Sequence, residues 1–369
     1  MQFIDLKTQY SRIEEKIKHN IDKVLQHGKF IMGPEVFELE EKLANFSGSK
    51  YCLSCSSGTD GLLIPLMAKG IGVGDKVLTT PFTYIATAEV INLLGAEPVF
   101  IDVDPKTFNI NPAHLQSVLD NDNQNIKGII PVNLFGLCAD YDTINKIAKK
   151  YNLFVLEDAA QSFGATYKDR RSCSLADVSS TSFFPAKPLG CYGDGGAIFT
   201  DDKDLYDVMD SIRIHGKGKD KYDCERIGLN GRLDTIQAAI LIAKLELYDE
   251  EIDLRQRVAN SYSEKLKSYF EVPFVPEDHT SVWAQYSILL EDNSVRERLM
   301  NELKEAGVPS MIYYKKPLHL QKTFSDLKYQ LGDFPISEDI SNRIFSLPMH
   351  PYLKESDIEK ICKILISNI

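Results

Sequence analysis

The sequence has no long apolar run. No stretch approaches the roughly 18 apolar residues of a membrane span, and the opening MQFIDLKTQYSRIEEKIK carries charges where a signal peptide has its apolar region. There is also no block of Lys and Arg, and the 369 residues have a formal net charge of −11. These absences disfavour a membrane or nucleic-acid partner, and we expect a cytoplasmic protein.

Cysteine is scarce and scattered. The seven cysteines are an odd number, which argues against a disulfide framework: Cys52, Cys55, Cys138, Cys173, Cys191, Cys224 and Cys362. Only Cys52 and Cys55 form a C-x-x-C pair, and no second pair or nearby His accompanies them. Because a zinc or redox centre would need such partners, we expect buried structural thiols and no metal site.

Two nucleotide-binding signatures are also missing. No G-x-G-x-x-G follows a first predicted strand, and no G-x-x-x-x-G-K-[ST] occurs. A nicotinamide-dependent dehydrogenase or a nucleoside-triphosphate enzyme is therefore disfavoured. With 43% hydrophobic and 26% charged residues, the composition is that of a globular protein. The length suggests about two domains.

Helical and strand patterns divide the chain. Apolar residues at helical spacing predict one helix that starts after a Ser11 cap and stops at Gly28, and a second that starts at Pro34. Their apolar stripes are Ile13, Ile17, Ile21 and Val24 in the first, and Val36, Leu39, Leu43 and Phe46 in the second. From residue 51 to about 200, short apolar runs alternate with helical stretches: KVLTT, PVFIDVD, GIIPVNL, LFVLEDAA, TSFFPA and GGAIFT.

This alternation predicts a parallel sheet covered on both faces, with the chemistry at the carboxyl ends of its strands. Beyond Gly231 an unusually long helical pattern predicts a helix that bridges two domains. Its acidic residues are expected to form a solvated face rather than a metal site: Glu246, Asp249, Glu250, Glu251 and Asp253. We place a large domain at 1–250, with a helical segment at 1–30, and a small α+β domain at 251–369.

Three segments at predicted strand ends could carry chemistry. In SCSSGTDGLL, the turn 56–59 opens a helix whose N–H groups could hold a phosphate, although a Ser or Thr helix cap is the simpler interpretation. In LFVLEDAAQSFGA, a strand delivers Glu157 and Asp158, which could be strand-end caps. In FFPAKPLGCYGDGG, Lys187 lies between two prolines and ahead of several glycines, where a lone lysine would ordinarily be a surface group.

The three segments together favour a pyridoxal phosphate site. That cofactor needs an amine for a Schiff base, a carboxylate against its pyridine nitrogen and a phosphate cradle. The phosphate-type turn, the acid and then Lys187, which lies 29 residues after Asp158, follow one another in the order that such a site requires.

On these residues the chain resembles the pyridoxal-phosphate sugar aminotransferases of the DegT/DnrJ/EryC/StrS family. The resemblance covers almost the whole chain through motifs in the same order: FIDLKTQY, GPEVFELEEKLANF, SSGTDGL, TTPFTYIATAEVI, PVFIDVDP, LEDAAQSFGA, FFPAKPLGCYGDGG, NGRLDTIQAAIL and SLPMHPYL. It implies an α/β, aspartate aminotransferase-like fold (fold type I), with a large, mostly parallel-sheet domain and a smaller α+β C-terminal domain.

The resemblance also implies residue roles. Lys187 matches the Schiff-base lysine, Asp158 the partner of the pyridine nitrogen, and Gln161 the side chain near the phenolic oxygen. The phosphate contacts correspond to Gly58, Thr59 and Ser182, and the ring that stacks on the cofactor to Tyr84. The asparagine that corresponds to Asn230 reaches the neighbouring subunit's cofactor in relatives, so a homodimer is expected.

The resemblance implies transfer of an amino group from L-glutamate to a UDP-linked ketosugar. The nearest branch aminates C3 of UDP-2-acetamido-2-deoxy-3-oxo-glucuronate for surface polysaccharide. A C4 aminotransferase acting on a UDP-4-keto-6-deoxy sugar and a non-catalytic sensor that binds the cofactor remain alternatives. Arg232 is the first candidate for the substrate's anionic groups, and Tyr314 and His319 are further candidates. Three other groups could equally be surface groups: Lys29, His215 and Arg213.

Overall fold

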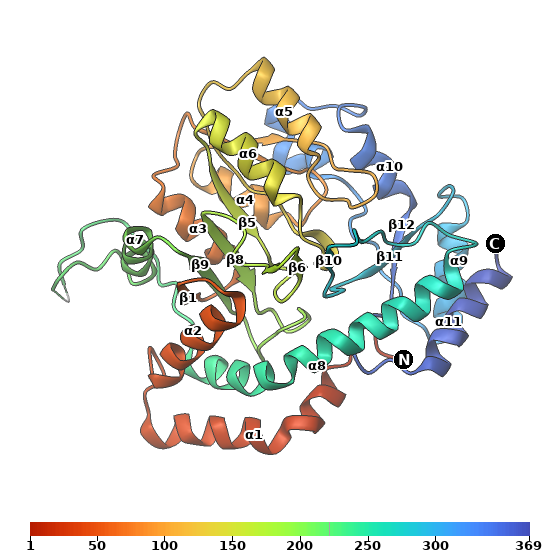
Figure 1. Cartoon of the computed structure of the whole chain (residues 1–369), viewed down its shortest axis with the longest axis horizontal. Helices are drawn as coiled ribbons and strands as arrows, with labels where there is room; N and C mark the ends of the chain where they lie inside the picture. Colours follow the sequence, from red (N-terminus) through yellow and green to blue (C-terminus); the bar gives the residue numbers. More distant parts are fainter. Residues whose placement is uncertain (221) are drawn as a thin grey trace.

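A seven-stranded sheet lies at the centre of the computed structural model, which describes residues 1–220 and 222–369 (Figure 1). The strand order is β1-β9-β8-β5-β4-β2-β3. Their bounds are β1 Tyr51–Cys55, β2 Lys76–Thr79, β3 Glu97–Phe100, β4 Ile126–Ile129, β5 Phe154–Asp158, β8 Val178–Ser182 and β9 Gly196–Thr200. The smaller sheets contain β6 Thr166–Tyr167, β7 Arg170–Arg171 and β10 His279–Thr280, and β11 Tyr286–Leu289 with β12 Ile344–Leu347.

The helices follow the expected alternation with the strands. Their bounds are α1 Leu6–His27, α2 Pro34–Ser47, α3 Gly58–Ala68, α4 Ala86–Leu93, α5 Pro112–Asn121, α6 Tyr141–Tyr151, α7 Lys203–Arg213, α8 Thr235–Leu266, α9 Arg296–Glu305, α10 Pro335–Arg343 and α11 Glu355–Ser367. Three short 3₁₀ segments are η1 Leu134–Gly136, η2 Leu318–Leu320 and η3 Lys322–Leu327. None of the helices within the described ranges is long and apolar enough to cross a membrane.

The sheet is mostly parallel but not wholly so. The strands from β8 through β5, β4 and β2 to β3 are parallel, whereas β9 runs antiparallel to both β8 and β1. The strand predicted from TSFFPA exists but lies earlier, because β8 spans Val178–Ser182 and the chain turns there into a long loop that returns as β9. This reversal places the loop that contains Lys187 at the carboxyl end of β8.

Alternating side chains bury both faces of the sheet. On β1, Leu53 packs with α3, α4 and α7, while Cys52 packs with α2 and α8 on the opposite face. On β5, Leu156 packs in the same cluster as Leu53, whereas Val155 packs in a separate cluster with α5 and α6. Because successive side chains of a strand point to opposite faces, these apolar runs require helices on both sides, as Figure 1 shows.

Helix α1 starts earlier than expected. It begins at Leu6 rather than after Ser11, because the carboxylate of Asp5 accepts hydrogen bonds from the backbone N–H and the hydroxyl of Thr8. The predicted end at Gly28 is confirmed, where φ is 68°. The predicted start of α2 at Pro34 is confirmed as well.

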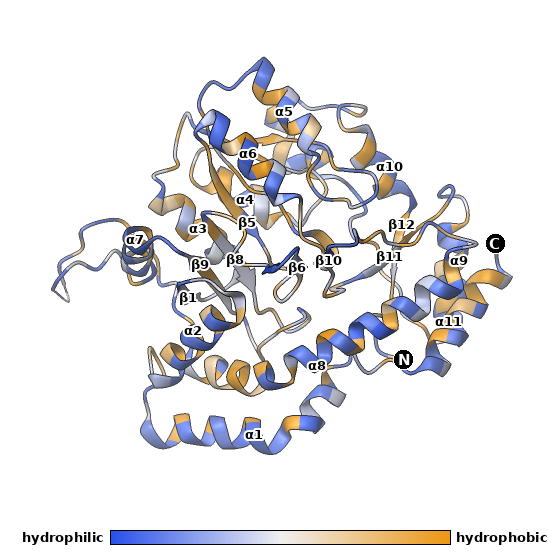
Figure 2. Ribbon diagram, in the orientation of Figure 1, coloured by the Kyte–Doolittle hydropathy of each residue, from blue (hydrophilic) through white to orange (hydrophobic). Residues whose placement is uncertain are grey.

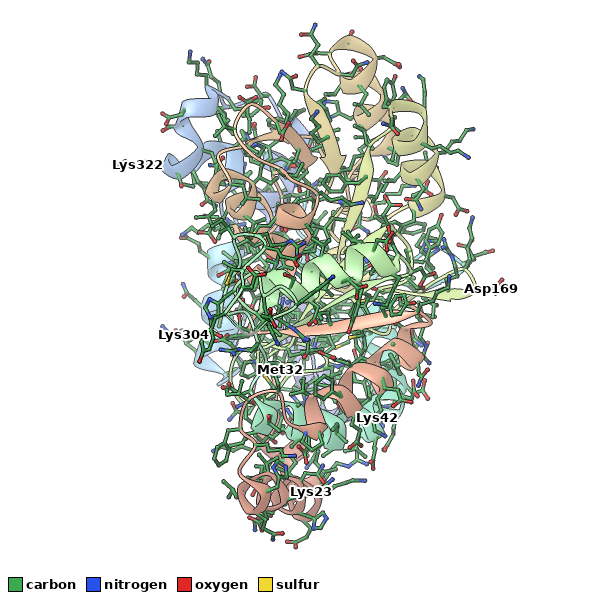
Figure 3. The ribbon with its side chains drawn as sticks, turned by 90° about the vertical axis from the view of Figure 1, so that its left-hand side faces the viewer. Lys23, Met32, Lys42, Asp169, Lys304 and Lys322 are labelled. Atoms are coloured by element: carbon green, nitrogen blue, oxygen red, sulfur yellow. The ribbon has the colours of Figure 1, made fainter. Side chains whose placement is uncertain are left out.

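Helix α1 is mainly hydrophilic in Figure 2, and its few apolar residues pack on the first turns of α8. In the side view, Lys23 on α1 and Lys42 on α2 lie in the lower part of the molecule, and Lys322 of η3 lies in the upper part (Figure 3). Helix α1 therefore forms one end of the molecule, away from the central sheet.

The long helix predicted beyond Gly231 is confirmed as α8, which spans 32 residues. Its first turns pack against α1 and α2, and its last turns pack on α11 and the β11–β12 sheet. The predicted boundary at residue 250 falls inside this helix, and the domain division stays a prediction.

The acidic face of α8 is solvated only in part. Glu246 pairs with Lys16, and Glu250 pairs with Arg12, on the exposed side of the helix. The expectation was wrong for Glu251, which is buried and accepts hydrogen bonds from the side chain of Gln9 at 2.9 and 3.0 Å. Within the described ranges no group of acidic, His or Cys side chains is arranged to hold a metal ion.

Cys52 and Cys55 are buried thiols, as expected, and of the seven free cysteines six are buried and Cys224 is exposed. Burial raises the pKa of the Cys52 thiol well above its ordinary value.

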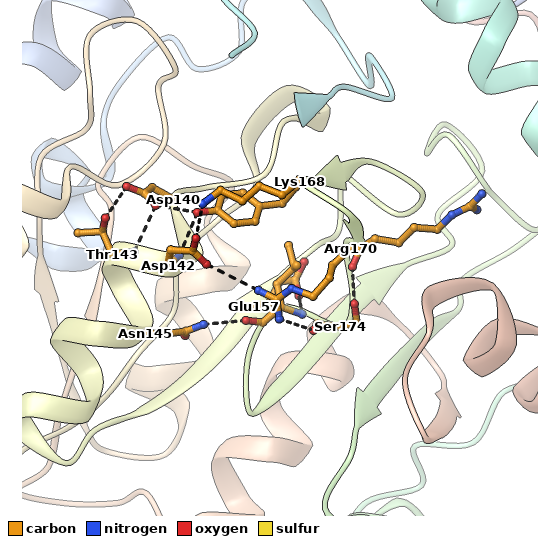
Figure 4. A network of polar contacts seen from close by, with 11 residues as sticks. Asp140, Asp142, Thr143, Asn145, Glu157, Lys168, Arg170 and Ser174 are labelled. Carbon is orange, nitrogen blue, oxygen red and sulfur yellow. Dashed lines mark hydrogen bonds and ion pairs between the residues drawn. The ribbon is translucent and has the colours of Figure 1, made fainter. Parts of the chain in front are cut away.

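A polar network fastens the β6–β7 turn to α6 (Figure 4). Lys168 in the turn forms an ion pair with Asp142, and Asn145 donates to the carbonyl of Leu175 at 2.9 Å. Glu157, in the same view, belongs to β5 and lies beneath this turn. The Lys168–Asp142 ion pair therefore joins the β6–β7 turn to the first turn of α6.

Candidate active site

The predicted site residues lie at one end of the strands of the central sheet. In the strand register, Gly196 at the start of β9 lies opposite both Cys55, the last residue of β1, and Ser182, the last residue of β8. The neighbouring strand β5 ends here with Asp158. The candidate residues therefore lie together at the carboxyl ends of neighbouring strands, and their part in the chemistry stays a prediction.

The turn after β1 brings a helix N-terminus to this end of the strands. Helix α3 begins at Gly58, and the hydroxyl of Ser57 caps it by accepting from the N–H of Asp60 at 3.1 Å. A Cβ added at Gly58 would lie 2.6 Å from Cβ of Ser182, so glycine is required for this close approach. The first-turn N–H groups, including that of Thr59, have no carbonyl partner within a helix. With Ser182 beside them, they form a cradle suited to a phosphate.

Strand β5 separates its two acids onto opposite faces. Glu157 is fully buried and accepts from Ser172, Ser179 and other donors beneath the sheet. Asp158 is also buried, and it accepts from the hydroxyl of Thr87 at 2.8 Å and from the N–H of Ala160 at 3.2 Å. Burial raises the pKa of Asp158, while these hydrogen bonds and the charge of Lys187 act in the opposite direction. Only Asp158 is therefore available to the candidate site.

Lys187 lies in a tight turn after β8. Its N–H donates to the carbonyl of Phe184 at 2.8 Å, and the two flanking prolines limit the freedom of the backbone. Burial lowers the pKa of the Lys187 amine to about 8, and the opposing effect of the Asp158 carboxylate only partly compensates. The neutral amine, which a nucleophile or general base requires, is therefore far more abundant near pH 7 than it would be at the ordinary pKa of a lysine.

Gln161 and two tyrosines complete this region. The side-chain oxygen of Gln161 accepts from the N–H of Phe135 at 2.8 Å, and its amide nitrogen donates to the hydroxyl of Tyr314 at 3.1 Å. Tyr84 precedes α4 and is 60% exposed, so its ring is free to cover a ligand. Both hydrogen bonds fix the Gln161 side chain next to the strand end that contains Asp158.

Two further candidate residues flank Gly231, whose carbonyl accepts from the N–H of Ser56 at 3.0 Å. Asn230 is exposed, and its side-chain oxygen accepts from Arg232 at 2.6 and 3.0 Å. The His319 ring is buried against Phe334 and contacts Glu338 at 3.0 Å, so the structure does not bring it to the Lys187 cluster.

The three groups that could equally be surface groups differ in burial. The surface alternative is wrong for Arg213, which is buried and pairs with Glu40 at 2.5 Å. Lys29 and His215 are both exposed, and the N–H of His215 donates to the carbonyl of Leu229 at 2.8 Å.

Sequence reasoning missed the role of Thr87. It lies within the quoted stretch TTPFTYIATAEVI, but this stretch contains several threonines, and only the folded chain shows that Thr87 reaches Asp158. Thr83 contacts the Thr87 hydroxyl at 3.3 Å and extends the same hydrogen-bonded chain.

The arrangement fits pyridoxal phosphate. A buried amine of lowered pKa, a buried carboxylate and a glycine-lined helix N-terminus supply the three kinds of contact that this cofactor needs. Fold and site therefore define a pyridoxal-phosphate enzyme of the aspartate aminotransferase-like α/β class.

Comparisons with known proteins identify the family. The family model of the DegT/DnrJ/EryC1/StrS aminotransferases matches residues 11–366, and the chain belongs to this family. It is 50% identical over 366 residues to the UDP-2-acetamido-2-deoxy-3-oxo-D-glucuronate aminotransferase of Pseudomonas aeruginosa, with 99% of each chain covered.

Solved structures agree in fold. A DegT DnrJ EryC1 StrS aminotransferase from Brucella abortus superposes with a TM-score of 0.95 at 48% identity, covering 100% of this chain and 99% of that one. Ntda from Bacillus subtilis, solved with the bound cofactor PMP, has a TM-score of 0.90 at 29% identity, covering 99% of this chain and 82% of that one. The predicted fold class is confirmed.

Proposed function

We propose that this chain transfers the amino group of L-glutamate to C3 of UDP-2-acetamido-2-deoxy-3-oxo-glucuronate, for the synthesis of surface polysaccharide. The chain is a sugar aminotransferase whose cofactor is pyridoxal 5'-phosphate. The finer assignment is supported chiefly by the 50% identity, over 99% of both chains, to an aminotransferase of that name. A cytoplasmic location is part of the proposal.

Lys187 and Asp158 are the proposed catalytic residues. When bound, the cofactor supplies an electron sink for the electron pair left at the donor's α-carbon. The Lys187 amine, with its pKa lowered to about 8 by burial, accepts the proton from that carbon in the first half-reaction and returns a proton to C3 of the sugar in the second. The Asp158 carboxylate holds the pyridine nitrogen in its cationic form.

The remaining contacts hold and orient the cofactor. The α3 N-terminus at Gly58 and Thr59, together with Ser182, is proposed to bind its phosphate. Gln161 is proposed to lie near the phenolic oxygen, and the exposed Tyr84 ring to stack on the pyridine ring.

We propose a homodimer in which Asn230 reaches the partner subunit's cofactor. The segment is held in place because the carbonyl of Gly231 accepts from the N–H of Ser56 at 3.0 Å, while the Asn230 side chain faces outward. Exposed apolar side chains at Ile31 and Phe184 would be covered by a second copy.

Arg232 is the proposed ligand for the anionic groups of the sugar nucleotide. Its guanidinium is oriented by the Asn230 side chain, and it can bind a carboxylate or phosphate through two N–H groups. Tyr314 remains a proposed substrate contact through its hydroxyl. The proposal does not use His319, because its ring is engaged by Glu338.

The decisive experiment supplies glutamate with isotopically labelled nitrogen and each ketosugar in turn. We expect the label in the product of the 3-oxo-glucuronate sugar. Label only in a UDP-4-keto-6-deoxy sugar would establish the C4 alternative, and tight cofactor binding without any transfer would establish the sensor. Lys187→Ala should abolish transfer in a folded protein, whereas Lys42→Ala, at an exposed lysine of α2, should not.

Hybrid dimers test the shared site. Lys187→Ala and Asn230→Ala subunits are each expected to form weakly active or inactive homodimers. If Asn230 acts in the partner's site, mixing them combines both defects in one site and leaves the other intact, so activity returns. No recovery in demonstrated heterodimers would mean that Asn230 serves its own subunit.

A further inference from the structure

Helix α8 contains a buried lysine that the proposed reaction does not use. Lys244 is 1% exposed. Within the described part of the chain, no carboxylate forms an ion pair with it, because the nearby Glu251 is engaged by Gln9 and Tyr352. A buried ammonium without a paired anion is costly unless its donors are used. Lys244 therefore needs an explanation in terms of its contacts.

The hydrogen bond and the cation–π contact of Lys244 both reach the loop that contains Lys187. Its Nζ donates to the carbonyl oxygen of Gly190 at 2.6 Å and lies 4.2 Å from the centre of the Tyr192 ring. The oxygen of Gln237, two turns earlier on α8, accepts from the N–H of Tyr192 at 2.8 Å. Two side chains of one helix thus bind the backbone of the loop on either side of residue 191.

Gly190 connects these hydrogen bonds from α8 to the turn that contains Lys187. A Cβ added at Gly190 would lie 2.6 Å from the carbonyl oxygens of both Phe184 and Pro185, so the loop closes on itself at this point. The N–H of Cys191 donates to the carbonyl of Phe183 at 2.8 Å, and this bond spans the turn that presents Lys187. A shift of the Gly190 carbonyl would therefore displace the whole turn.

We propose that Lys244 is a positioning residue, which holds the Gly190 carbonyl from α8 and so fixes the turn that aims the Lys187 amine at the cofactor. This inference rests on the role of Lys187 given under Proposed function. Burial lowers the pKa of Lys244 to about 8, but the neutral amine also has N–H groups to donate, so the tie is present in both protonation states. Methionine would fill the same volume and provide no donor.

The test compares Lys244→Met with Tyr262→Phe. Tyr262 is a matched control, since it is buried on the same helix and donates to the carbonyl of Pro348 at 3.0 Å, in the small domain. Hydrogen exchange of residues 183–193 is measured by mass spectrometry in the cofactor-free protein. The rate of cofactor binding, kcat, and KM for glutamate are then measured.

In Lys244→Met we expect exchange in 183–193 to become about tenfold faster, with β8 and β9 unchanged. Cofactor binding should slow, and kcat should fall about tenfold, because a small displacement of a reacting group is costly, while KM for glutamate changes little. Tyr262→Phe should leave all four quantities within about twofold of the parent protein.

Other outcomes would overturn the proposal. If hydrogen exchange, cofactor binding and kcat are all unchanged in Lys244→Met, Lys244 does not position the turn. If exchange is faster but binding and kcat are unchanged, Lys244 is merely structural. If Lys244→Met does not fold, Tyr192→Leu removes the ring beneath the ammonium. Tyr192→Leu should make hydrogen exchange in 183–193 faster and lower kcat, as expected for Lys244→Met, and no change in either quantity would refute the proposal. Activity that survives Lys187→Ala would instead refute the proposed function, so the two failures are distinguishable.

Discussion

Replacement of Asp158 by Asn removes a negative charge that faces Lys187 while it preserves the size of the side chain. The two groups are electrostatically coupled, because the Asp158 carboxylate raises the pKa of Lys187 against the larger lowering effect of burial. In Asp158→Asn the lowering effect is unopposed, so the Lys187 pKa should fall below its value of about 8.

The size of the effect follows from the fraction of neutral amine. At pH 7 an amine with a pKa of about 8 is neutral in about one molecule in eleven, against about one in three thousand at the ordinary value of 10.5. Burial alone therefore increases the reactive fraction by about 300-fold. In Asp158→Asn this fraction can rise by no more than about elevenfold, because it cannot exceed one.

Turnover should change in the opposite direction. A neutral amide cannot stabilise a cationic pyridine nitrogen as a carboxylate does, and a charge-assisted hydrogen bond contributes about 1.5–3 kcal/mol. We therefore expect kcat to fall by about ten- to a hundredfold or more. Faster reaction of the Lys187 amine combined with slower turnover distinguishes this role of Asp158 from a general loss of structure.

The assay mixes cofactor-free protein with pyridoxal phosphate and follows absorbance between about pH 6 and pH 10. The rate of the reaction between the Lys187 amine and pyridoxal phosphate should change its pH dependence near pH 8 in the parent protein and at lower pH in Asp158→Asn. An unchanged pH dependence would refute the electrostatic coupling of the two groups. Unchanged turnover would mean that Asp158 is only a strand-end cap.

Two further predictions concern the cradle and the buried ion pair. Gly58→Ala should weaken cofactor binding by at least about tenfold, because its Cβ would lie 2.6 Å from Cβ of Ser182. Gly72→Ala is the control in the same titration, since a Cβ added there would lie no closer than 3.9 Å to any neighbouring atom. Equal affinities of the two variants would refute the close approach. Arg213→Met leaves Glu40 buried without its cation, and should lower the free energy of unfolding in urea by about 3 kcal/mol; a loss below about 1 kcal/mol would show that the pair is energetically neutral.

Local patterns in the sequence were sufficient for several elements of the fold. The glycine at position 28 ends α1 because it adopts the left-handed conformation without a steric cost, and Pro34 begins α2 because its ring fixes φ at a helical value. The alternation of apolar runs with helical stretches likewise predicts helices on both faces of a mainly parallel sheet. The start of α1 was missed because Asp5 and Ser11 are both plausible caps, and the hydrogen bonds from Thr8 decide between them.

The sequence by itself determined which chemistry is present and in which order. A small polar turn, an acid at a strand end and a lysine between prolines are local signals, and their order indicates pyridoxal phosphate chemistry without any coordinates. Only the tertiary structure decided which polar groups are buried and what they touch. Contacts between Thr87 and Asp158, or between Lys244 and Gly190, join residues distant in sequence. Hydrophobic periodicity does not record such contacts, because the surrounding packed elements, not the local chain, set the burial and hence the protonation of each group.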